Sequence, residues 1–167
     1  PTGEAILSTP GGISRISTRK ITLTQKAAHY EAITAARHNR RGFVTGSNLK
    51  VPGHPEKGFR YEASDNDGLW TALYIAAESY RYAVTKSSDA RALAVKSMSA
   101  LLDLTRLSGH EGFPGRAIMK KDEIADGFNP NETVRIHGET EKIWYTSPVD
   151  PNLWVKGDTS SDELDGH

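Results

Sequence analysis

The sequence predicts a mainly helical fold, built from antiparallel helical hairpins joined by long irregular loops. An apolar stripe at helical spacing predicts an amphipathic helix and consists of Leu69, Leu73, Ala76, Ala77, Tyr80 and Val84. Residues 87–89 then supply a helix start after a very short turn, and Gly109 suits the end of the second helix. This second helix is expected to bury Ala94, Met98, Leu101 and Leu102. Because so short a turn makes two helices antiparallel neighbours, the pair is predicted to form a hairpin.

A shorter helix is predicted ahead of this hairpin. Thr22 and Gln25 have capping-box spacing, and the stretch up to about Asn39 is rich in residues that favour helices. Residues 1–20 mix Gly, Pro, Ser and Thr without a sustained period, so we interpret them as a leader or linker. Residues 21–167 would form the domain itself, with a long loop at residues 42–64.

The region after the hairpin is predicted to be irregular. Short extended pieces are expected at residues 116–119, 141–145 and 153–156. Ser160 and Glu163 again have capping-box spacing. Because a helix start stands so near the end of the sequence, we expect the remainder of a larger chain to follow it.

The composition argues against several function classes. Lysine plus arginine and aspartate plus glutamate both total 21 in 167 residues, which disfavours a nucleic-acid binder that neutralises phosphates. No run of about 18 apolar residues is present, so no membrane span is expected. The chain has no cysteines, and its six histidines match no recognised metal spacing. We therefore expect no metal, no cofactor, no nucleic-acid partner and no membrane partner.

A polar and aromatic stripe is predicted along the first hairpin helix, opposite its apolar stripe. Trp70, Tyr74, Glu78 and Arg81 follow one another at spacings of four, four and three. One interpretation is an ordinary helix surface with an ion pair worth ~0.3 kcal/mol. The other is the wall of a polar cleft, because aromatic rings present flat apolar area to sugar rings while carboxylates bind hydroxyls.

Two acidic segments are candidates for paired-carboxylate chemistry. Asp65 and Asp67 precede the first hairpin helix, where helix capping is the simpler explanation. Asp158, Asp162 and Glu163 crowd the start of the last helix, and like charges so close raise one another's pKa. Glycosidic-bond cleavage requires a protonated carboxyl and an ionised partner, so capping and catalysis both stay open.

Three segments of the chain are distinctive as a set: DNDGLWTALYIAAESYRYAVTKSSDARALA, LSGHEGFPGRAI and WVKGDTSSDELDGH. Together they resemble an uncharacterised group of bacterial proteins that is similar to the six-hairpin glycosidase superfamily. The resemblance covers about residues 22–167. It implies that these residues are a partial segment of an (α/α)6-type toroid, with a substrate cleft lined by loops and helix ends.

The resemblance implies a carbohydrate-active enzyme, with a glycoside hydrolase as the first expectation. Its partner would be an oligosaccharide or polysaccharide, and we expect a secreted or periplasmic location. Two alternatives stay open: a polysaccharide lyase in which Arg116 neutralises a uronate, and a noncatalytic helical module that binds glycans or proteins. The catalytic candidates are Asp158, Asp162, Glu163, Asp65 and Asp67, and the substrate-binding candidates are Trp70, Tyr74, Arg116, His110 and Trp154.

Overall fold

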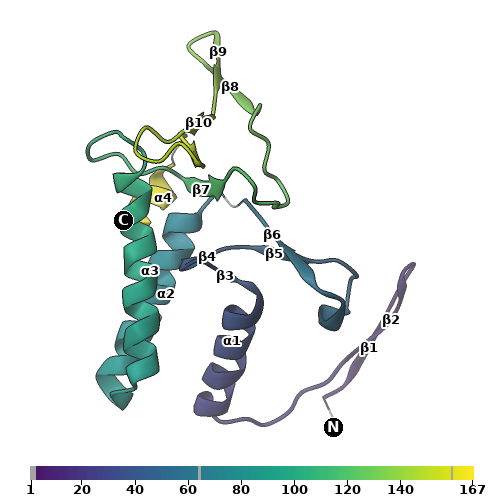
Figure 1. Cartoon of the computed structure of the whole chain (residues 1–167). Helices are drawn as coiled ribbons and strands as arrows, with labels where there is room; N and C mark the ends of the chain where they lie inside the picture. Colours follow the sequence, from purple (N-terminus) through teal and green to yellow (C-terminus); the bar gives the residue numbers. More distant parts are fainter. Residues whose placement is uncertain (1–2, 64, 159) are drawn as a thin grey trace. The chain divides into compact units, whose positions relative to one another are not determined.

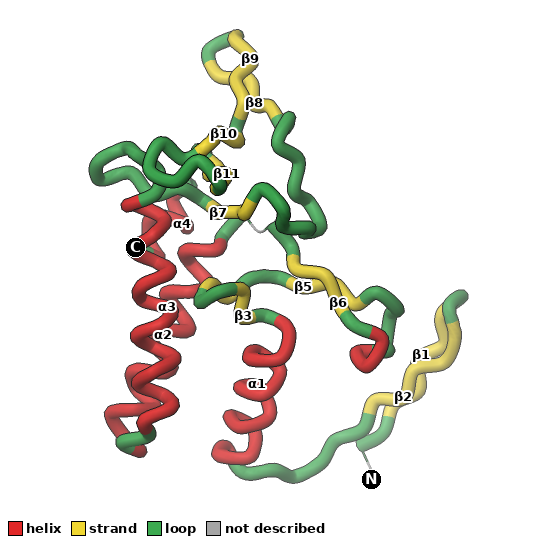
Figure 2. The backbone as a smooth tube through the Cα atoms, viewed as in Figure 1, coloured by secondary structure: helices red, strands yellow, loops and turns green. Residues whose placement is uncertain are grey.

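The computed structural model of the chain describes residues 3–63, 65–158 and 160–167. It is a mixed α/β structure, with 38% of residues in helices and 25% in strands that form several small sheets (Figures 1 and 2). The prediction of a mainly α, toroid-type fold is therefore wrong. The error arises outside the helical hairpin, because segments that were predicted to be irregular pair their backbone groups as short antiparallel strands.

The chain divides into two compact units, Pro1–Ile33 and Thr34–His167. The first unit contains an exposed antiparallel hairpin of β1 (Ala5–Thr9) and β2 (Gly12–Ile16), where a leader or linker was predicted. Most of α1 (Leu23–Arg37) also belongs to it. The Thr22 backbone N–H donates to the Gln25 side chain at 2.9 Å, and the Gln25 N–H donates to the Thr22 hydroxyl at 3.1 Å. The predicted capping box is therefore confirmed.

The second unit contains the predicted helical hairpin, formed by α2 (Asp67–Thr85) and α3 (Ser88–Arg106), which lie side by side (Figure 1). Lys86 ends α2 in the left-handed conformation, and its N–H donates to the Tyr82 carbonyl. The Ser87 hydroxyl then accepts a hydrogen bond from the Ala90 N–H and caps α3. The hairpin prediction is confirmed, and none of the helices in the described residues is both long and apolar enough to cross a membrane.

The hairpin buries a different face from the one that the apolar period predicts. Leu73 and Tyr80 are 56% and 75% exposed, whereas Thr71 and Ile75 of the same helix are buried. The reason is that α2 packs on β4 (Phe43–Val44) as well as on α3. The Val44 N–H of β4 donates to the Thr71 hydroxyl at 2.9 Å, so this polar side chain belongs to the inner face.

Short strands and a final helix fill the rest of the second unit. β10, β11 and β7 form a three-stranded antiparallel sheet in that order, and the other strands pair as the hairpins β3–β4, β5–β6 and β8–β9. Between Gly42 and Ala63, the predicted long loop contains β4, which pairs with β3, the hairpin β5–β6 and a turn of 3-10 helix, and Ser64 lies outside the described residues. The bounds are β3 (Asn39–Arg40), β4 (Phe43–Val44), β5 (Ser47–Leu49), η1 (Pro55–Lys57), β6 (Phe59–Tyr61), β7 (Ala117–Lys120), β8 (Thr133–Ile136), β9 (Glu139–Lys142), β10 (Trp144–Thr146), β11 (Leu153–Lys156) and α4 (Ser161–Gly166).

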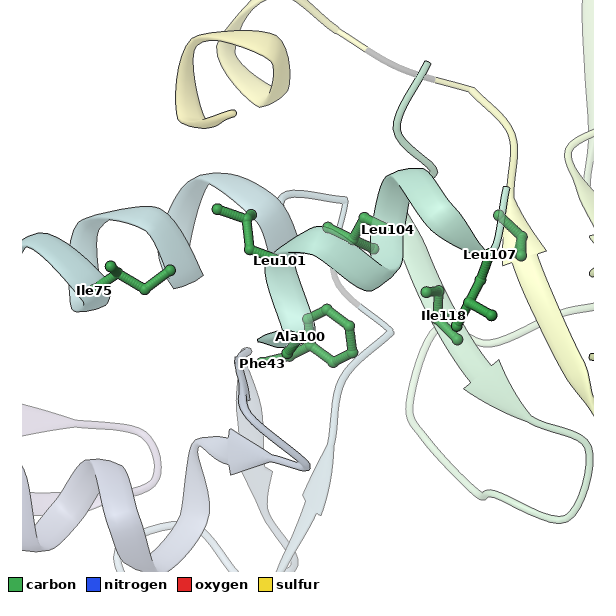
Figure 3. Close-up of a cluster of buried hydrophobic side chains, with 8 residues drawn as sticks. Phe43, Ile75, Ala100, Leu101, Leu104, Leu107 and Ile118 are labelled. Carbon is green, nitrogen blue, oxygen red and sulfur yellow. The ribbon is translucent and has the colours of Figure 1, made fainter. Parts of the chain in front are cut away.

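β7 is buried on both faces and separates two apolar clusters. Ile118 faces a cluster with Leu101 and Leu104 of α3, drawn in Figure 3. Met119, the next residue along the strand, faces the second cluster, which contains Trp144. Alternate residues of a strand point to opposite faces, so this one strand joins the helical hairpin to the strands that follow it.

Part of the predicted α3 core lies outside these clusters. Leu101 is buried as predicted, but Met98 and Leu102 are 42% and 61% exposed. The buried positions of α3 include Ala100 and Ser97 instead, where small side chains let the turn between β3 and β4 approach the helix. The sequence period shows which residues share a face, but the backbone that approaches α3 decides which face is covered.

Candidate functional site

Asp67, at the first position of α2, is part of an ion pair inside the protein. The Arg40 guanidinium, carried on β3, donates to its carboxylate at 2.6 Å, and the two side chains are 1% and 0% exposed. Arg40 also donates to the Ile118 carbonyl at 2.8 Å and lies 3.4 Å from Glu123. Asp67 therefore lies in the interior and lines no open cleft.

Burial raises the pKa of Asp67 to about 7, from an ordinary value of 3.8. The Arg40 charge opposes this shift, because it favours the ionised carboxylate, and the nearby Glu163 carboxylate adds to it. The effect of desolvation is the larger one. Asp67 thus has the pKa of a catalytic acid in a position that a substrate does not reach.

The contribution of Asp67 to the free energy of unfolding is expected to decrease as the pH rises from about 4 to about 7. The folded protein binds a proton at Asp67 more tightly than the unfolded chain does. This stabilisation is fully present below the ordinary pKa and is lost as the pH rises through the folded pKa, with a slope of at most about 1.4 kcal/mol per pH unit. Urea unfolding at several pH values measures it. Asp67→Asn should remove this component, and an unchanged slope in that variant would contradict the assignment.

Glu163 of α4 caps α2. Its carboxylate accepts hydrogen bonds from the Gly68 N–H at 2.8 Å and the Leu69 N–H at 3.2 Å, and its side chain is fully buried. A Cβ at position 68 would lie 2.1 Å from the Glu163 oxygen, so only glycine allows this approach. The predicted capping box of Ser160 and Glu163 does not form. Instead, Glu163 neutralises the positive end of a helix from another part of the chain.

Asp65, just before α2, forms an ion pair with Lys156 at the end of β11. The Lys156 ammonium lies 2.5 Å from the Asp65 carboxylate and 3.5 Å from that of Glu132. Lys156 is nearly buried, and its ammonium stands 5.7 Å from the centre of the Trp144 ring. The Asp65 side chain, in contrast, is 57% exposed. The pair therefore joins a buried lysine to an aspartate at the surface.

Arg116, just before β7, joins the same loop to the segment after β11. Its Nε donates to the Asp65 carbonyl, and its Nη1 donates to the Asp158 carboxylate at 2.8 Å. Its Nη2 reaches the Ser160 hydroxyl at 3.4 Å, and that hydroxyl donates to Asp162. The Ser160 hydrogen bond is the main reason why the pKa of Asp162 is lowered. These contacts define the Arg116 cluster: Asp65, Arg116, Glu132, Lys156, Asp158, Ser160 and Asp162.

The four other predicted binding residues lie on α2, on β11 and in the loop after α3. Trp70 is in the first turn of α2 and is 47% exposed, and Tyr74 follows one turn later and is partly buried. Trp154 lies on β11, with the Lys121 ammonium 5.5 Å from its ring. His110 stands edge-on to Tyr145, at 5.9 Å between ring centres. Two exposed aromatic residues lie close in sequence to the cluster: Trp70, five residues after Asp65, and Phe113, 37% exposed and three residues before Arg116.

The structure thus brings Asp65, Arg116 and Asp158 together, whereas Asp67 and Glu163 are buried in other interactions. Sequence reasoning missed Arg40, Glu132 and Lys156. The sequence did offer an indication of Lys156, because a lysine that follows Trp154 and Val155 on a short apolar strand is a candidate for a buried ion pair. Arg40 and Glu132 had none, because their partners lie 27 and 24 residues away in the chain. Such pairings become visible only in three dimensions.

The cluster is suited to holding polar groups in fixed positions. Four carboxylates and two cations from separate segments alternate in it, and the cations are the more buried members. Within the described residues, no group of three or more His, Asp or Glu side chains is placed to hold a metal ion. Comparison with known proteins found no matching family model, no matching curated protein and no matching solved structure.

Proposed function

We propose that the Arg116 cluster binds a neutral saccharide and that the chain acts there as a binding module. The observation that supports this is the convergence of Asp65, Arg116 and Asp158 from three separate segments, with hydrogen-bonding geometry fixed between them. Few, precisely held polar groups are what give a binding site its orientation and specificity.

The exposure of the cluster suits contact with hydroxyl groups. Asp65 and Asp158 are 57% and 27% exposed, while their partners Lys156 and Arg116 are 5% and 16% exposed. The buried cations therefore hold the carboxylates in place, and the exposed carboxylate of Asp65 can accept hydrogen bonds from sugar hydroxyls. The Asp158 Oδ1 atom is buried and its Oδ2 atom accepts from Arg116, so Asp158 positions Arg116. Trp70, in the first turn of α2 and five residues after Asp65, offers an exposed ring of the kind that packs against the apolar face of a sugar.

The charge balance favours a neutral sugar over a uronate. The cluster has twice as many carboxylates as cations, so an added carboxylate would meet net repulsion. Arg116 already has an anionic partner in Asp158. A lyase site, in which Arg116 would neutralise the substrate's own carboxylate, receives less support from this arrangement than a site for neutral sugars.

The same geometry favours binding over hydrolysis. Hydrolysis needs a protonated carboxyl that reaches the leaving oxygen. The carboxyl with a pKa near 7 is Asp67, which is fully buried, whereas the exposed Asp162 has a lowered pKa. Glu163 is occupied at the start of α2. The exposed carboxylate of Asp162 can therefore accept hydrogen bonds at the surface, whereas the carboxyl group with the raised pKa, Asp67, is enclosed in the interior.

Asp65→Asn and Trp70→Ala are expected to weaken saccharide binding. Isothermal titration with cellopentaose, xylopentaose and mannopentaose should show at least one ligand whose affinity falls about tenfold or more in Asp65→Asn, because a hydrogen bond to a charged group is worth about 1.5–3 kcal/mol. Glu139→Gln, on exposed strand β9, is the matched control and should bind like the wild type.

Two results would overturn this proposal. In one, Asp65→Asn and Trp70→Ala bind every sugar that the wild type binds with unchanged affinity, or the wild type binds none. In the other, new reducing ends accumulate during incubation with a pentasaccharide and disappear in Asp158→Asn, which would make the chain an enzyme.

A further inference from the structure

A cavity of about 410 Å³ opens between α3 and the β3–β4 turn. It lies within the size range of small-molecule pockets, and its lining shares no residue with the Arg116 cluster. Arg41, Lys96 and Ser99 give it a polar edge with two cations, and Phe43, Leu107 and Ile118 give it an apolar wall. A cationic edge beside an apolar wall indicates a ligand with an anionic head and an apolar body.

The backbone at Arg41 has a left-handed conformation that arginine rarely adopts. Arg41 and Gly42 are the two residues of the turn between β3 and β4, with φ values of 59° and 110°. Two-residue turns with positive φ at both positions favour Asn, Asp or Gly at the first. Gly42 is required, since a Cβ there would lie 2.9 Å from the Lys96 carbonyl. Non-glycine residues held in this region cluster at ligand sites.

The Arg41 guanidinium is anchored at one nitrogen. Its Nη2 donates to the Ile118 carbonyl and pairs with Glu123, both at 3.1 Å. Among the residues that the structure describes, its Nη1 and Nε donate no hydrogen bond. Burial is the largest influence on Arg41 and lowers its pKa, and Glu123 opposes this. A partly desolvated cation with remaining donors gains from an anionic ligand.

Lys96 supplies a second cation to the same cavity. It forms no ion pair and no side-chain hydrogen bond with any residue in the described part of the chain. Ser99 and Asp103 follow it on the same side of α3, at spacings of three and four. Asp103 is engaged by Arg106, at 3.0 and 2.8 Å, and its charge opposes a second negative charge on a ligand.

We propose that this cavity binds a small amphipathic monocarboxylate. The carboxylate lies between Arg41 and Lys96, within reach of the Ser99 hydroxyl, and the apolar body covers Phe43 and Leu107. A monocarboxylate fits better than a phosphate dianion, because Asp103 lines the same space.

The test is a titration of the ¹⁵N-labelled full chain with octanoate, followed by amide chemical shifts. Octan-1-ol, which has the same chain length without the charge, is the matched ligand. Octanoate is expected to shift the amides of Phe43, Ser99 and Leu107, and to bind about tenfold or more tightly than octan-1-ol.

Arg41→Asn is the decisive variant, because asparagine suits the turn and the fold should be kept. We expect its octanoate affinity to fall about tenfold or more, and Lys96→Met to weaken binding as well. Lys142→Met, on the exposed strand β9, should bind like the wild type.

Three outcomes would overturn the proposal: no octanoate shifts at the cavity, equal affinity for octanoate and octan-1-ol, or unchanged affinity in a folded Arg41→Asn variant. Asp65→Asn should leave octanoate binding unchanged. The two proposed sites can therefore fail independently.

Discussion

Replacing Arg40 by methionine is expected to destabilise the second unit by about 3–5 kcal/mol, the range for removing one partner of a buried ion pair. The substitution leaves the Asp67 carboxylate in the interior without its cation, and the Ile118 carbonyl loses a donor. Because the pKa of Asp67 is already about 7 and would rise further, part of the loss should be relieved at about pH 5, where the carboxyl is protonated. Urea unfolding at two pH values measures both effects.

Two further variants decide whether loss of the Arg40–Asp67 ion pair causes the predicted destabilisation. The double variant Arg40→Met/Asp67→Leu should recover much of the lost stability, since apolar replacement of both partners is often neutral. Arg60→Met removes the arginine of an exposed pair, Arg60 with Asp126 at 3.6 Å, and should cost no more than about 1 kcal/mol. A loss in Arg40→Met no larger than in Arg60→Met would contradict this assignment.

Glu163→Ala is expected to reduce stability by about 2–3 kcal/mol, because it removes a charged acceptor from one buried and one partly buried N–H group at the start of α2. The negative charge of the carboxylate also stabilises the positive, N-terminal end of that helix. Glu163→Gln keeps an acceptor oxygen of similar size and should lose less. Hydrogen exchange of the Gly68 and Leu69 amides reports the cap directly, and both should exchange faster in Glu163→Ala.

Asp165→Ala is the matched control for this prediction. Asp165 lies on the same short helix and is exposed, so its loss should change stability by no more than about 0.5 kcal/mol. Unchanged protection of the Gly68 and Leu69 amides in Glu163→Ala would show that the cap contributes nothing.

Local sequence patterns predicted where the long helices lie, but they did not predict which face of each helix is buried. The α2–α3 hairpin followed from apolar spacing and a short turn, and the Thr22–Gln25 box formed as predicted, because both depend on neighbours in the chain. The exposed Leu73 and the buried Thr71 could not be foreseen. Which face of α2 is covered depends on β4, a two-residue strand with no periodic signal of its own.

The candidate site, like the fold, was predictable only where it depends on neighbours in the chain. Acidic residues near helix starts identified the two segments that meet, at Asp65 and at Asp158. Their partners were not predictable from spacing, since Arg116 lies 51 residues from Asp65 and 42 from Asp158. Glu163 has the spacing of a cap for its own helix, yet it caps α2, because α4 packs on the first turn of that helix. Long-range pairing decided which carboxylates stay exposed and which are enclosed.

The most direct test of the saccharide site is an amide and indole NMR titration with cellopentaose, xylopentaose and mannopentaose in turn. The shifts should centre on Asp65, Arg116, Asp158 and the Trp70 indole for at least one sugar, while the sugar stays intact. If no sugar at about 10 mM moves these signals, or if the shifts fall elsewhere in the chain, the Arg116 cluster is not a saccharide-binding site.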